Sequence, residues 1–311
     1  MSKFFEESYD TVKEKNPYID EMKVSSINCP SQGVFYPKNL VVSYRLYSFG
    51  ELKFLTPKVL KEENPDTVKD YIDTCLKGIT LSDPSFNKYD LCYYDFIYLS
   101  IIRKFPSIAK NPEEPYDVAS RCPHCGNMNI SALDIMSIQF NEYKYLEPIK
   151  ISISKEVIYE FTPLTIKSYL KMLDFKSKSK NELDLDVLFI ASCVNSDEPL
   201  ENIYNTIYSI QNRNVILKLQ ELEDSLSLSL LPYLLQCSNC QEDYYLKLDS
   251  NKIEYSLAFP IFSKDGELNS YYKSLLELSK RLSKHFNISI LDVNYMSLND
   301  ILLLLENSNS D

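Results

Sequence analysis

The spacing of apolar and polar positions divides the chain into short strands and amphipathic helices. Apolar and polar side chains alternate over 41–47 and 149–153, which predicts half-buried strands. Over 65–77, 89–104 and 216–235 the apolar positions recur at helical spacing instead. Because strands and helices are interspersed along the sequence, we assign the chain to the α+β class.

Two Thr-Pro pairs are expected to start helices. Thr56 and Thr162 would be the N-caps, and Pro57 and Pro163 would occupy the first helical positions. Proline suits that position because its missing N–H would have no helical partner there in any case.

The predicted elements occur twice in the same order. Each copy contains a strand, helices, a Cys-x-x-Cys turn and a further strand, the last over 128–138 and 244–248. The second Thr-Pro pair lies 106 positions after the first, and the second Cys-x-x-Cys pair lies 115 positions after the first, so a short insertion would separate the copies. We therefore predict two degenerate copies of one module, with chance similarity between two α+β stretches as the alternative.

This pattern divides the chain into four parts. Residues 1–37 are expected to form an extended N-terminal arm that ends in a lead-in strand. The first module with its Cys-x-x-Cys turn would occupy 38–141, and the second would occupy 142–261. The C-terminal part, 262–311, has a different pattern.

The C-terminal part is predicted to be a helical hairpin. Apolar residues from Leu268 to Phe286 follow helical spacing. Ser297 and Asp300 then form a variant of the capping box, which would start a second helix that runs through Leu305.

Charge and hydropathy exclude two classes of partner. The 311 residues include 44 acidic and 33 basic side chains, a net charge of -11, which argues against a broad nucleic-acid-binding surface. No apolar run approaches the roughly 20 residues that a membrane span needs, and the first residues lack the apolar stretch of a signal peptide. We expect a protein made in the cytosol, without a membrane span.

Two cysteine pairs carry the clearest chemistry. Cys122 and Cys125 flank Pro-His, and Cys237 and Cys240 flank Ser-Asn. Two intervening residues let one tight turn present both sulfurs to a single ion, and four thiolates suit structural zinc. We predict one zinc-ribbon-like site shared by the two modules. Two separate ions with further ligands, or thiols without metal, are the alternatives.

The remaining cysteines and the histidine within the first pair have simpler interpretations. His124 is interpreted as a residue of the turn and not as a further ligand. Isolated cysteines in a chain without an export signal are usually small buried hydrophobes. The isolated cysteines are Cys29, Cys75, Cys92 and Cys193.

An enzymatic function is disfavoured, with one alternative kept open. The chain has no Gly-rich phosphate loop, no G-x-S-x-G elbow and no H-E-x-x-H motif, and we expect no small-molecule substrate. Cys-Pro-His-Cys also occurs in thioredoxin-like oxidoreductases, so a thiol-disulfide oxidoreductase using Cys122 and Cys125 is the alternative. In those enzymes the motif precedes a helix, whereas here a predicted strand follows it. A nucleic-acid-binding zinc ribbon would conflict with the charge.

Several short motifs form a set whose order is informative. Pro-Ser-Gln-Gly-Val-Phe-Tyr-Pro at 30–37 matches Pro-Ser-x-Gly-x-x-Tyr-Pro, the predicted helix that starts at Tyr-Asp-Leu (89–91) ends in Ile-Ile-Arg (101–103), and 122–126 matches Cys-Pro-x-Cys-Gly. The Tyr-Tyr helix at 271–272 and the segment 292–296 complete the set. In these motifs the chain resembles the baseplate hub subunit and hub-assembly proteins of T-even-like contractile-tailed phages. It departs from them at Cys29, where an aliphatic residue is more usual, and at Gln241, which replaces the glycine after the second pair.

The resemblance implies a non-enzymatic structural or assembly protein of the baseplate hub. Its partners would be other baseplate and tail proteins, and it would be found in the host cytoplasm during assembly and in the virion tail baseplate. A reducing cytoplasm favours zinc thiolate over disulfides. An assembly chaperone that is absent from the mature particle is the alternative within this resemblance.

Overall fold

The fold is described from a computed structural model. The described residues are 22–59, 65–108, 116–133, 139–141, 147–228, 231–246, 276–284, 286, 288–298, 300–301 and 304.

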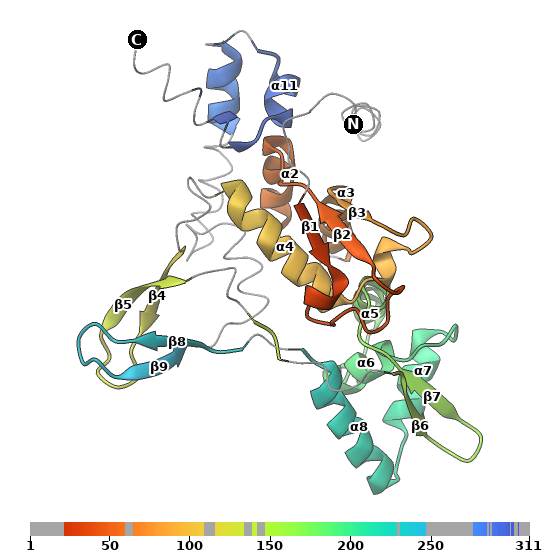
Figure 1. Ribbon diagram of the computed structural model, residues 1–311. Coiled ribbons are helices and arrows are strands. Elements are labelled where there is room, and N and C mark those ends of the chain that lie inside the picture. The colour runs from red at the N-terminus through yellow and green to blue at the C-terminus, as the bar shows by residue number, and fades with distance from the viewer. Residues whose placement is uncertain are drawn as a thin grey trace.

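The first module is a small antiparallel sheet covered by helices. Strands β1 (Met22–Ser25), β2 (Val41–Tyr44) and β3 (Ile79–Leu81) pair in that order, with Val42 opposite both Val24 and Leu81. In β2 the side chains of Val42 and Tyr44 are buried and those between them are partly exposed, as the alternating pattern predicts. Helices α2 (Phe49–Val59), α3 (Pro65–Lys77) and α4 (Tyr93–Ile108) complete the module (Figure 1).

The second module repeats the hairpin and adds four helices. Strands β6 (Ile149–Ser152) and β7 (Ile158–Phe161) pair antiparallel. The helices that follow pack around them (Figure 1). They are α5 (Ile166–Lys178), α6 (Leu185–Ser192), α7 (Leu200–Tyr208) and α8 (Arg213–Leu226).

The backbone contacts show that the two modules share one plan. In the first, Tyr44 pairs with Ile79 on the third strand, and in the second Phe161 forms a bridge with Val194. A backbone hydrogen bond from the next residue is also the same in both modules. The N–H of Arg45 donates to Gly78 O at 3.1 Å, and the N–H of Thr162 donates to Cys193 O at 2.9 Å. The predicted repeat is therefore present in the fold.

The modules are joined edge to edge and share one core. Cys92, just before α4, forms an antiparallel bridge with Thr165, just before α5. Two backbone bonds close the bridge, from Tyr93 N to Leu164 O at 2.8 Å and from Ile166 N to Leu91 O at 3.0 Å. Buried apolar side chains of both modules form a single cluster, so the two modules pack as one body.

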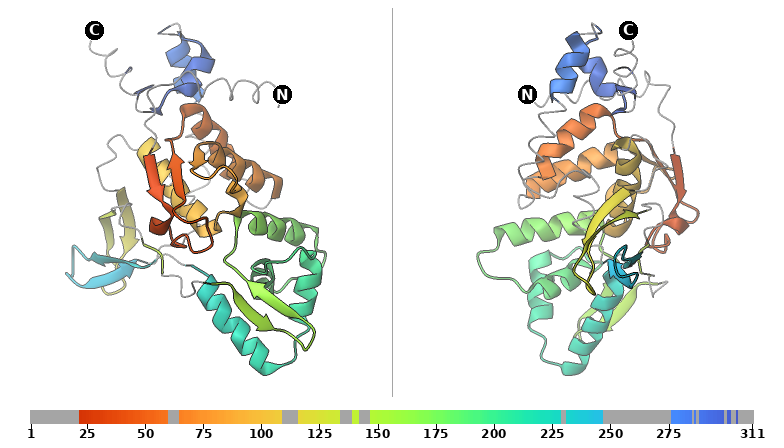
Figure 2. Two further views of the ribbon diagram at one scale, coloured as in Figure 1. Left: turned by 45° about the vertical axis from the view of Figure 1, so that its right-hand side comes forward. Right: turned by 90° about the vertical axis from the view of Figure 1, so that its left-hand side faces the viewer.

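Two further hairpins form a lobe beside this body. Strands β4 (Tyr116–Arg121) and β5 (Met128–Leu133) pair, as do β8 (Tyr233–Gln236) and β9 (Asp243–Leu246). The hairpins come from different modules, yet they lie side by side in every view (Figures 1 and 2). Their buried side chains form a second, smaller cluster.

The C-terminal segment packs on the opposite end of the first module from the second module. Residues 276–284 are helical and α11 (Ile290–Tyr295) follows. The C-terminal helices lie beside α2 (Figure 2). Met296 O accepts a bond of 2.9 Å from the N–H of Phe49, at the start of α2. Apolar side chains of this segment join the main core; they are Leu282, Val293, Leu298 and Ile301.

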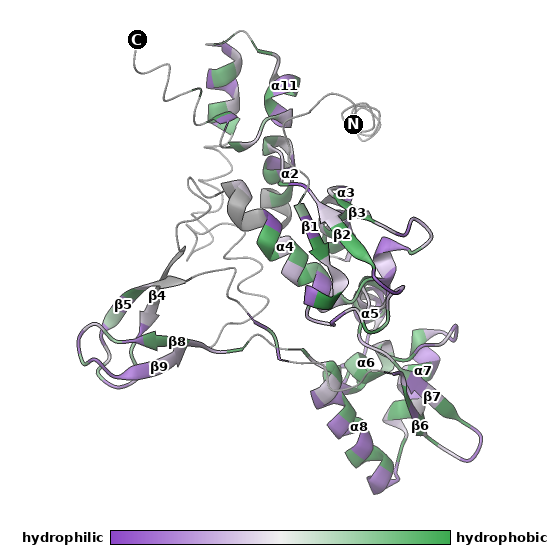
Figure 3. Cartoon of the chain, viewed as in Figure 1, coloured by the Kyte–Doolittle hydropathy of each residue, from purple (hydrophilic) through white to green (hydrophobic). Residues whose placement is uncertain are grey.

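Helix α8 alternates hydrophilic and hydrophobic bands along its length (Figure 3), and its residues Val215, Leu219 and Leu222 are buried.

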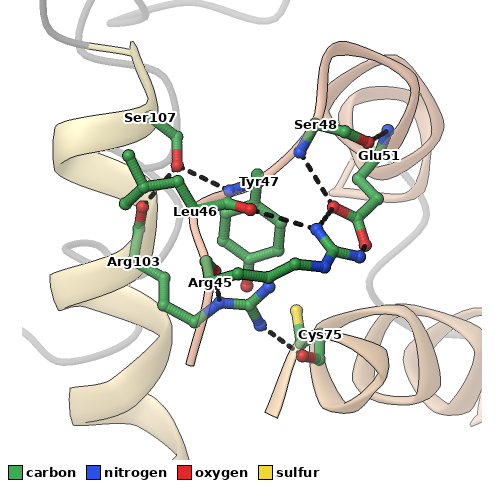
Figure 4. A network of polar contacts seen from close by, with 8 residues as sticks. All are labelled: Arg45, Leu46, Tyr47, Ser48, Glu51, Cys75, Arg103 and Ser107. Carbon is green, nitrogen blue, oxygen red and sulfur yellow. Dashed lines mark hydrogen bonds and ion pairs between the residues drawn. The ribbon is translucent and has the colours of Figure 1, made fainter. Parts of the chain in front are cut away.

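A polar network fixes the link from β2 to α2. Arg45 donates two bonds of 2.7 Å to the fully buried carboxylate of Glu51, which also accepts from Ser48 N (Figure 4). Burial alone would raise the pKa of Glu51, but the Arg45 hydrogen bonds and charge outweigh it and hold that pKa below its usual range.

Arg103 of α4 is the second charged group in this network. It is fully buried, donates from Nε to Arg45 O at 2.8 Å and from a terminal nitrogen to Cys75 O, and stacks 4.0 Å from the Tyr47 ring centroid. Gly78 lies against it, and a Cβ at that position would overlap the guanidinium. Arg103 therefore ties α4 to α3 and to the β2–α2 link.

The Pro-Ser-x-Gly-x-x-Tyr-Pro motif docks on α4. Ser31 donates to the buried Asp95 carboxylate from its N–H at 2.7 Å and from its hydroxyl at 2.5 Å, and Tyr36 donates from its hydroxyl at 2.5 Å. Gly33 has a φ of +66°, and a Cβ there would lie 2.6 Å from Ser26 Oγ, so the turn requires glycine. Burial raises the pKa of Asp95 to about 6.

Most predicted elements are present, but both Thr-Pro predictions are wrong. Helix α2 begins at Phe49, so Thr56 and Pro57 lie within it, and α5 begins at Ile166 with Thr165 as its N-cap. The two Thr-Pro pairs are therefore not equivalent positions. Arg45 and Thr162 are equivalent and lie 117 positions apart, close to the 115 of the cysteine pairs, so no sizeable insertion separates the modules.

Other helix boundaries differ from the predicted ones. The helix expected over 216–235 ends at Leu226, and its last part is β8. The helix expected from position 89 begins at Tyr93, after a short 3-10 turn. The capping box of Ser297 and Asp300 is confirmed, with Asp300 N donating to Ser297 Oγ at 3.0 Å. Residues 1–21 of the expected arm lie outside the described part, as does 268–275 of the predicted C-terminal helix.

Candidate metal centre

Each cysteine pair occupies the turn of a β-hairpin, and the two turns have the same backbone. Cys122 N donates to Asn127 O at 2.9 Å, and Cys237 N donates to Glu242 O at 3.0 Å. The fifth residue of each turn has a positive φ, +73° at Gly126 and +62° at Gln241. The turn of the second pair therefore keeps the geometry of the first although it lacks the glycine.

The four sulfur atoms form one cluster. Cys122 Sγ lies 3.8 Å from Cys240 Sγ, Cys125 Sγ lies 3.6 Å from Cys237 Sγ, and all four lie within 4.8 Å of one another. Sulfurs placed tetrahedrally at about 2.3 Å from a central ion would be about 3.8 Å apart. A disulfide needs a distance of about 2 Å, and all four cysteines are free. The donor set and its spacing fit a tetrahedral metal ion.

The cluster is half enclosed by the lobe. Cys122 and Cys237 are buried, Cys240 is partly exposed and Cys125 is exposed. Leu235 and Tyr244 pack beside the buried pair. The four-sulfur cluster thus forms part of the small core of the lobe.

Asn129 connects one hairpin to the turn of the other. It lies on β5, is 3% exposed, and its Oδ1 accepts from Ser238 N at 3.0 Å and from Ser238 Oγ at 2.8 Å. Its Nδ2 lies 3.5 Å from Cys237 Sγ. Such second contacts orient a ligand and tune its charge. We did not predict this role from the sequence, although an asparagine at an inward position of a strand was a signal for it.

Hydrogen bonds favour thiolate at one buried position. The N–H groups of Cys240 and Asn239, helped by Asn129, lower the pKa of Cys237 to about 6. At Cys240 the N–H of Glu242 acts in the same direction, but burial and the neighbouring thiols raise the pKa to about 12. Four adjacent thiols resist joint ionisation without a cation, and a bound metal ion supplies the missing positive charge.

His124 has the position predicted for it. Its Nε2 lies 3.2 Å from the backbone oxygen of Asp243, on the other hairpin, and its backbone N–H lies 3.4 Å from Cys122 Sγ. The ring is therefore directed at the second hairpin and is not part of the four-sulfur cluster.

The rest of the described chain gives a consistent background. The isolated cysteines predicted to be buried are all buried: Cys29, Cys75, Cys92 and Cys193. Burial raises the pKa of Cys92 and of Cys193 well above the usual thiol range. Over the described ranges, no helix combines the length and apolarity needed to cross a bilayer.

Comparison of the chain with protein-family models, with curated proteins and with solved structures gave no match.

Proposed function

We propose that this chain is a non-enzymatic structural or assembly protein of a phage tail baseplate hub, clamped by one zinc ion. The observation that carries the proposal is the four-sulfur cluster, to which each module contributes two cysteines. Such an ion would join chain segments more than a hundred residues apart. That role is mechanical, because it fixes two hairpins relative to each other.

Zinc is the ion that this donor set suits best. Four thiolates in a tetrahedron favour zinc or iron, and zinc brings no redox chemistry. A chain made in a reducing cytoplasm keeps its cysteines available as thiolates. The hydrogen bonds to Cys237 support the same assignment, since they stabilise negative charge on sulfur.

The contacts of the resemblance motifs support a structural role. Ser31 and Tyr36 of the Pro-Ser-x-Gly-x-x-Tyr-Pro motif bind Asp95 on α4, the helix that carries the second motif. Arg103, with which that motif ends, is buried and binds backbone oxygens. The first motif thus binds the helix that carries the second, and the contact holds the N-terminal turn on α4.

The oxidoreductase alternative is less well supported by the geometry. A reactive Cys-x-x-Cys pair usually gains its low pKa from the N-terminus of a helix. Here both pairs lie in hairpin turns, between β4 and β5 and between β8 and β9.

The shared clamp is tested by metal content. Cys122→Ser and Cys237→Ser, one in each module, should each lose most of the bound zinc and lower the stability of the lobe. Cys193→Ala is the matched control, because that thiol is buried in the second module away from the cluster and its loss should leave zinc binding intact. Full zinc content in either serine variant would rule out one shared ion, and iron in the purified protein would correct the metal.

The hub role is tested by quantitative mass spectrometry of purified particles and of infected-cell lysate. A small fixed copy number per particle would support a built-in subunit. Abundance in lysate alone would favour the assembly chaperone. Absence from particles and from tail-assembly intermediates would overturn both.

A further inference from the structure

In both modules the first residue of a helix donates its N–H to a carbonyl from elsewhere in the chain. The segment that supplies this carbonyl differs between the two modules. In the second module the N–H of Ile166, the first residue of α5, donates to Leu91 O. In the first module the N–H of Phe49, the first residue of α2, donates to Met296 O. Phe49 and Ile166 are equivalent, because each lies four residues after the matched positions Arg45 and Thr162.

The two occupants do not make the same number of bonds. The segment around Leu91 forms a two-bond bridge, since Tyr93 N also donates to Leu164 O. At the equivalent place on the first module, the backbone contacts within the described residues comprise the single bond from Phe49 to Met296. Among the described residues, the C-terminal segment therefore supplies one of the two bonds of such a bridge.

Close packing against the C-terminal segment depends on a glycine. A Cβ at Gly50 would lie 2.9 Å from Asn294 O and 3.0 Å from Asn294 Cβ. The equivalent residue beside the segment around Leu91 is Lys167, one position after Ile166, and its side chain is exposed. A side chain at this position is thus compatible with an occupant like the Leu91 segment, but it collides with the present one.

The second module carries a counterpart of the Leu91 segment that makes no such contact among the described residues. Leu91 and Cys92 directly precede α4, and in the second module the turn 209–212 directly precedes α8. Gln211 and Asn212 are exposed, and so is Tyr208 beside them. This turn lies at the far end of the molecule from the C-terminal segment (Figures 1 and 2).

We propose that the start of α2 is a docking site for a second copy of this chain, and that segment 288–301 covers it in the single molecule. When the segment is displaced, the turn 209–212 of another copy takes its place and repeats the contact that Leu91 makes with α5. Because donor and acceptor surfaces lie at opposite ends, the contact is head-to-tail and builds rows or rings. The inference rests on backbone geometry and is independent of the hub role.

The test displaces the segment in the full-length protein. Gly50→Ala places a methyl group against Asn294, while alanine favours the helix, so α2 itself should not be weakened. Sedimentation velocity should show a mass that rises with protein concentration for Gly50→Ala and stays constant for the wild type. Hydrogen exchange of 288–301 reports whether the segment has left its site.

A second substitution identifies the surface that docks. The N–H equivalent to that of Tyr93 belongs to Arg213, the first residue of α8, where proline is well tolerated. Asn212 is already extended, as a residue before proline must be. Gly50→Ala with Arg213→Pro should remain monomeric because that donor is gone. Gly50→Ala with Arg213→Ala, which keeps the N–H and removes the charge, should still associate.

Three results would overturn the proposal. One is a chain whose segment has lost exchange protection but which stays monomeric. Another is association that Arg213→Pro does not reduce. The third is full exchange protection of the segment in both Gly50→Ala and Val293→Asp. Val293 is fully buried, so an aspartate there places a charge in the core. A segment that stays protected in both variants would be a permanent part of the core.

Discussion

Gln241 occupies a backbone conformation in which most residues other than glycine are strained. Its φ is +62°, whereas the matched residue of the first turn, with φ of +73°, is Gly126. A side chain in the left-handed region costs roughly 1–2 kcal/mol. We expect Gln241→Gly to stabilise the metal-loaded lobe by about 1 kcal/mol in denaturant unfolding at fixed zinc concentration.

The reverse substitution is the control for this effect. No atom lies within 4 Å of the position that a Cβ at Gly126 would take, so Gly126→Ala should destabilise by a similar amount through backbone strain alone. Equal stability of Gln241→Gly and wild type would mean that the Gln241 side-chain bond to Ser238 O compensates for the strain.

Asp95 should make the stability of the body depend on pH. Aspartate titrates near 3.8 in its ordinary environment, and burial raises the pKa of Asp95 to about 6. The folded state therefore holds the proton more tightly, so this contribution to stability is complete below about pH 3.8 and is lost as the pH rises to about 6.

The substitution Asp95→Asn isolates that contribution. The unfolding free energy of wild type minus that of the variant should fall by about 3 kcal/mol across the window and then stay level. Urea unfolding at a series of pH values measures it. A difference that is flat or rises with pH would show that Asp95 does not hold its proton in the fold.

At the residue scale, the sequence identified the four cysteines whose sulfurs the fold brings together, but not the groups that orient them. Two Cys-x-x-Cys pairs are recognisable because one tight turn must present both sulfurs. The contact of Asn129 with Ser238 joins two hairpins, and it depends on how those hairpins lie against each other. Local spacing carries no such information.

Helix starts were the weakest prediction at the scale of elements, because the capping signal that starts α2 was missed. Ser48 and Glu51 form a reciprocal capping box at the start of α2, with each side chain accepting from the backbone N–H of the other. The Ser-x-x-Glu spacing is visible in the sequence. The Thr-Pro pairs were a misleading signal, because a proline also occurs where no helix begins.

The N-cap of α5 provides a direct comparison. Thr165 Oγ1 accepts from Ser168 N at 3.1 Å. Thr162 lies three residues before Thr165, directly after the last residue of β7. Thr165→Ala should cost about 1 kcal/mol of unfolding free energy, as the loss of an N-cap usually does. Thr162→Ala should cost clearly less. The two alanine variants, compared in urea, test the position of the cap, and a larger loss at Thr162 would restore the original prediction.

At the scale of the whole molecule, metal removal should separate the lobe from the body. The lobe has its own small core, distinct from the single core that joins the two modules and the C-terminal segment. A unit of this size rarely folds without a metal or disulfides. A zinc chelator should therefore abolish hydrogen-exchange protection in β4, β5, β8 and β9 and leave α4 protected. Protection lost equally in both parts would show that the clamp also holds the body.

The repeat could be predicted because the spacing of apolar and polar positions along the sequence shows the order of the elements. The contacts that join the modules to each other and to the C-terminal segment could not be predicted. The bridge of Cys92 with Thr165 and the bond of Phe49 to Met296 join positions that share no pattern and are far apart in the chain. Such contacts depend on how the folded elements pack against each other, so only the three-dimensional structure shows them.

The division of the sulfur ligands between two distant turns also has a consequence for biosynthesis. Cys237 follows Cys122 by 115 positions, so a ribosome adding about 5–20 residues per second makes the first pair roughly 6–23 s before the second. During that interval the early pair can offer an ion only two of its four sulfurs. At the proposed shared site, tight loading would await nearly all of the second module, and bound metal would mark a polypeptide translated to at least its second hairpin.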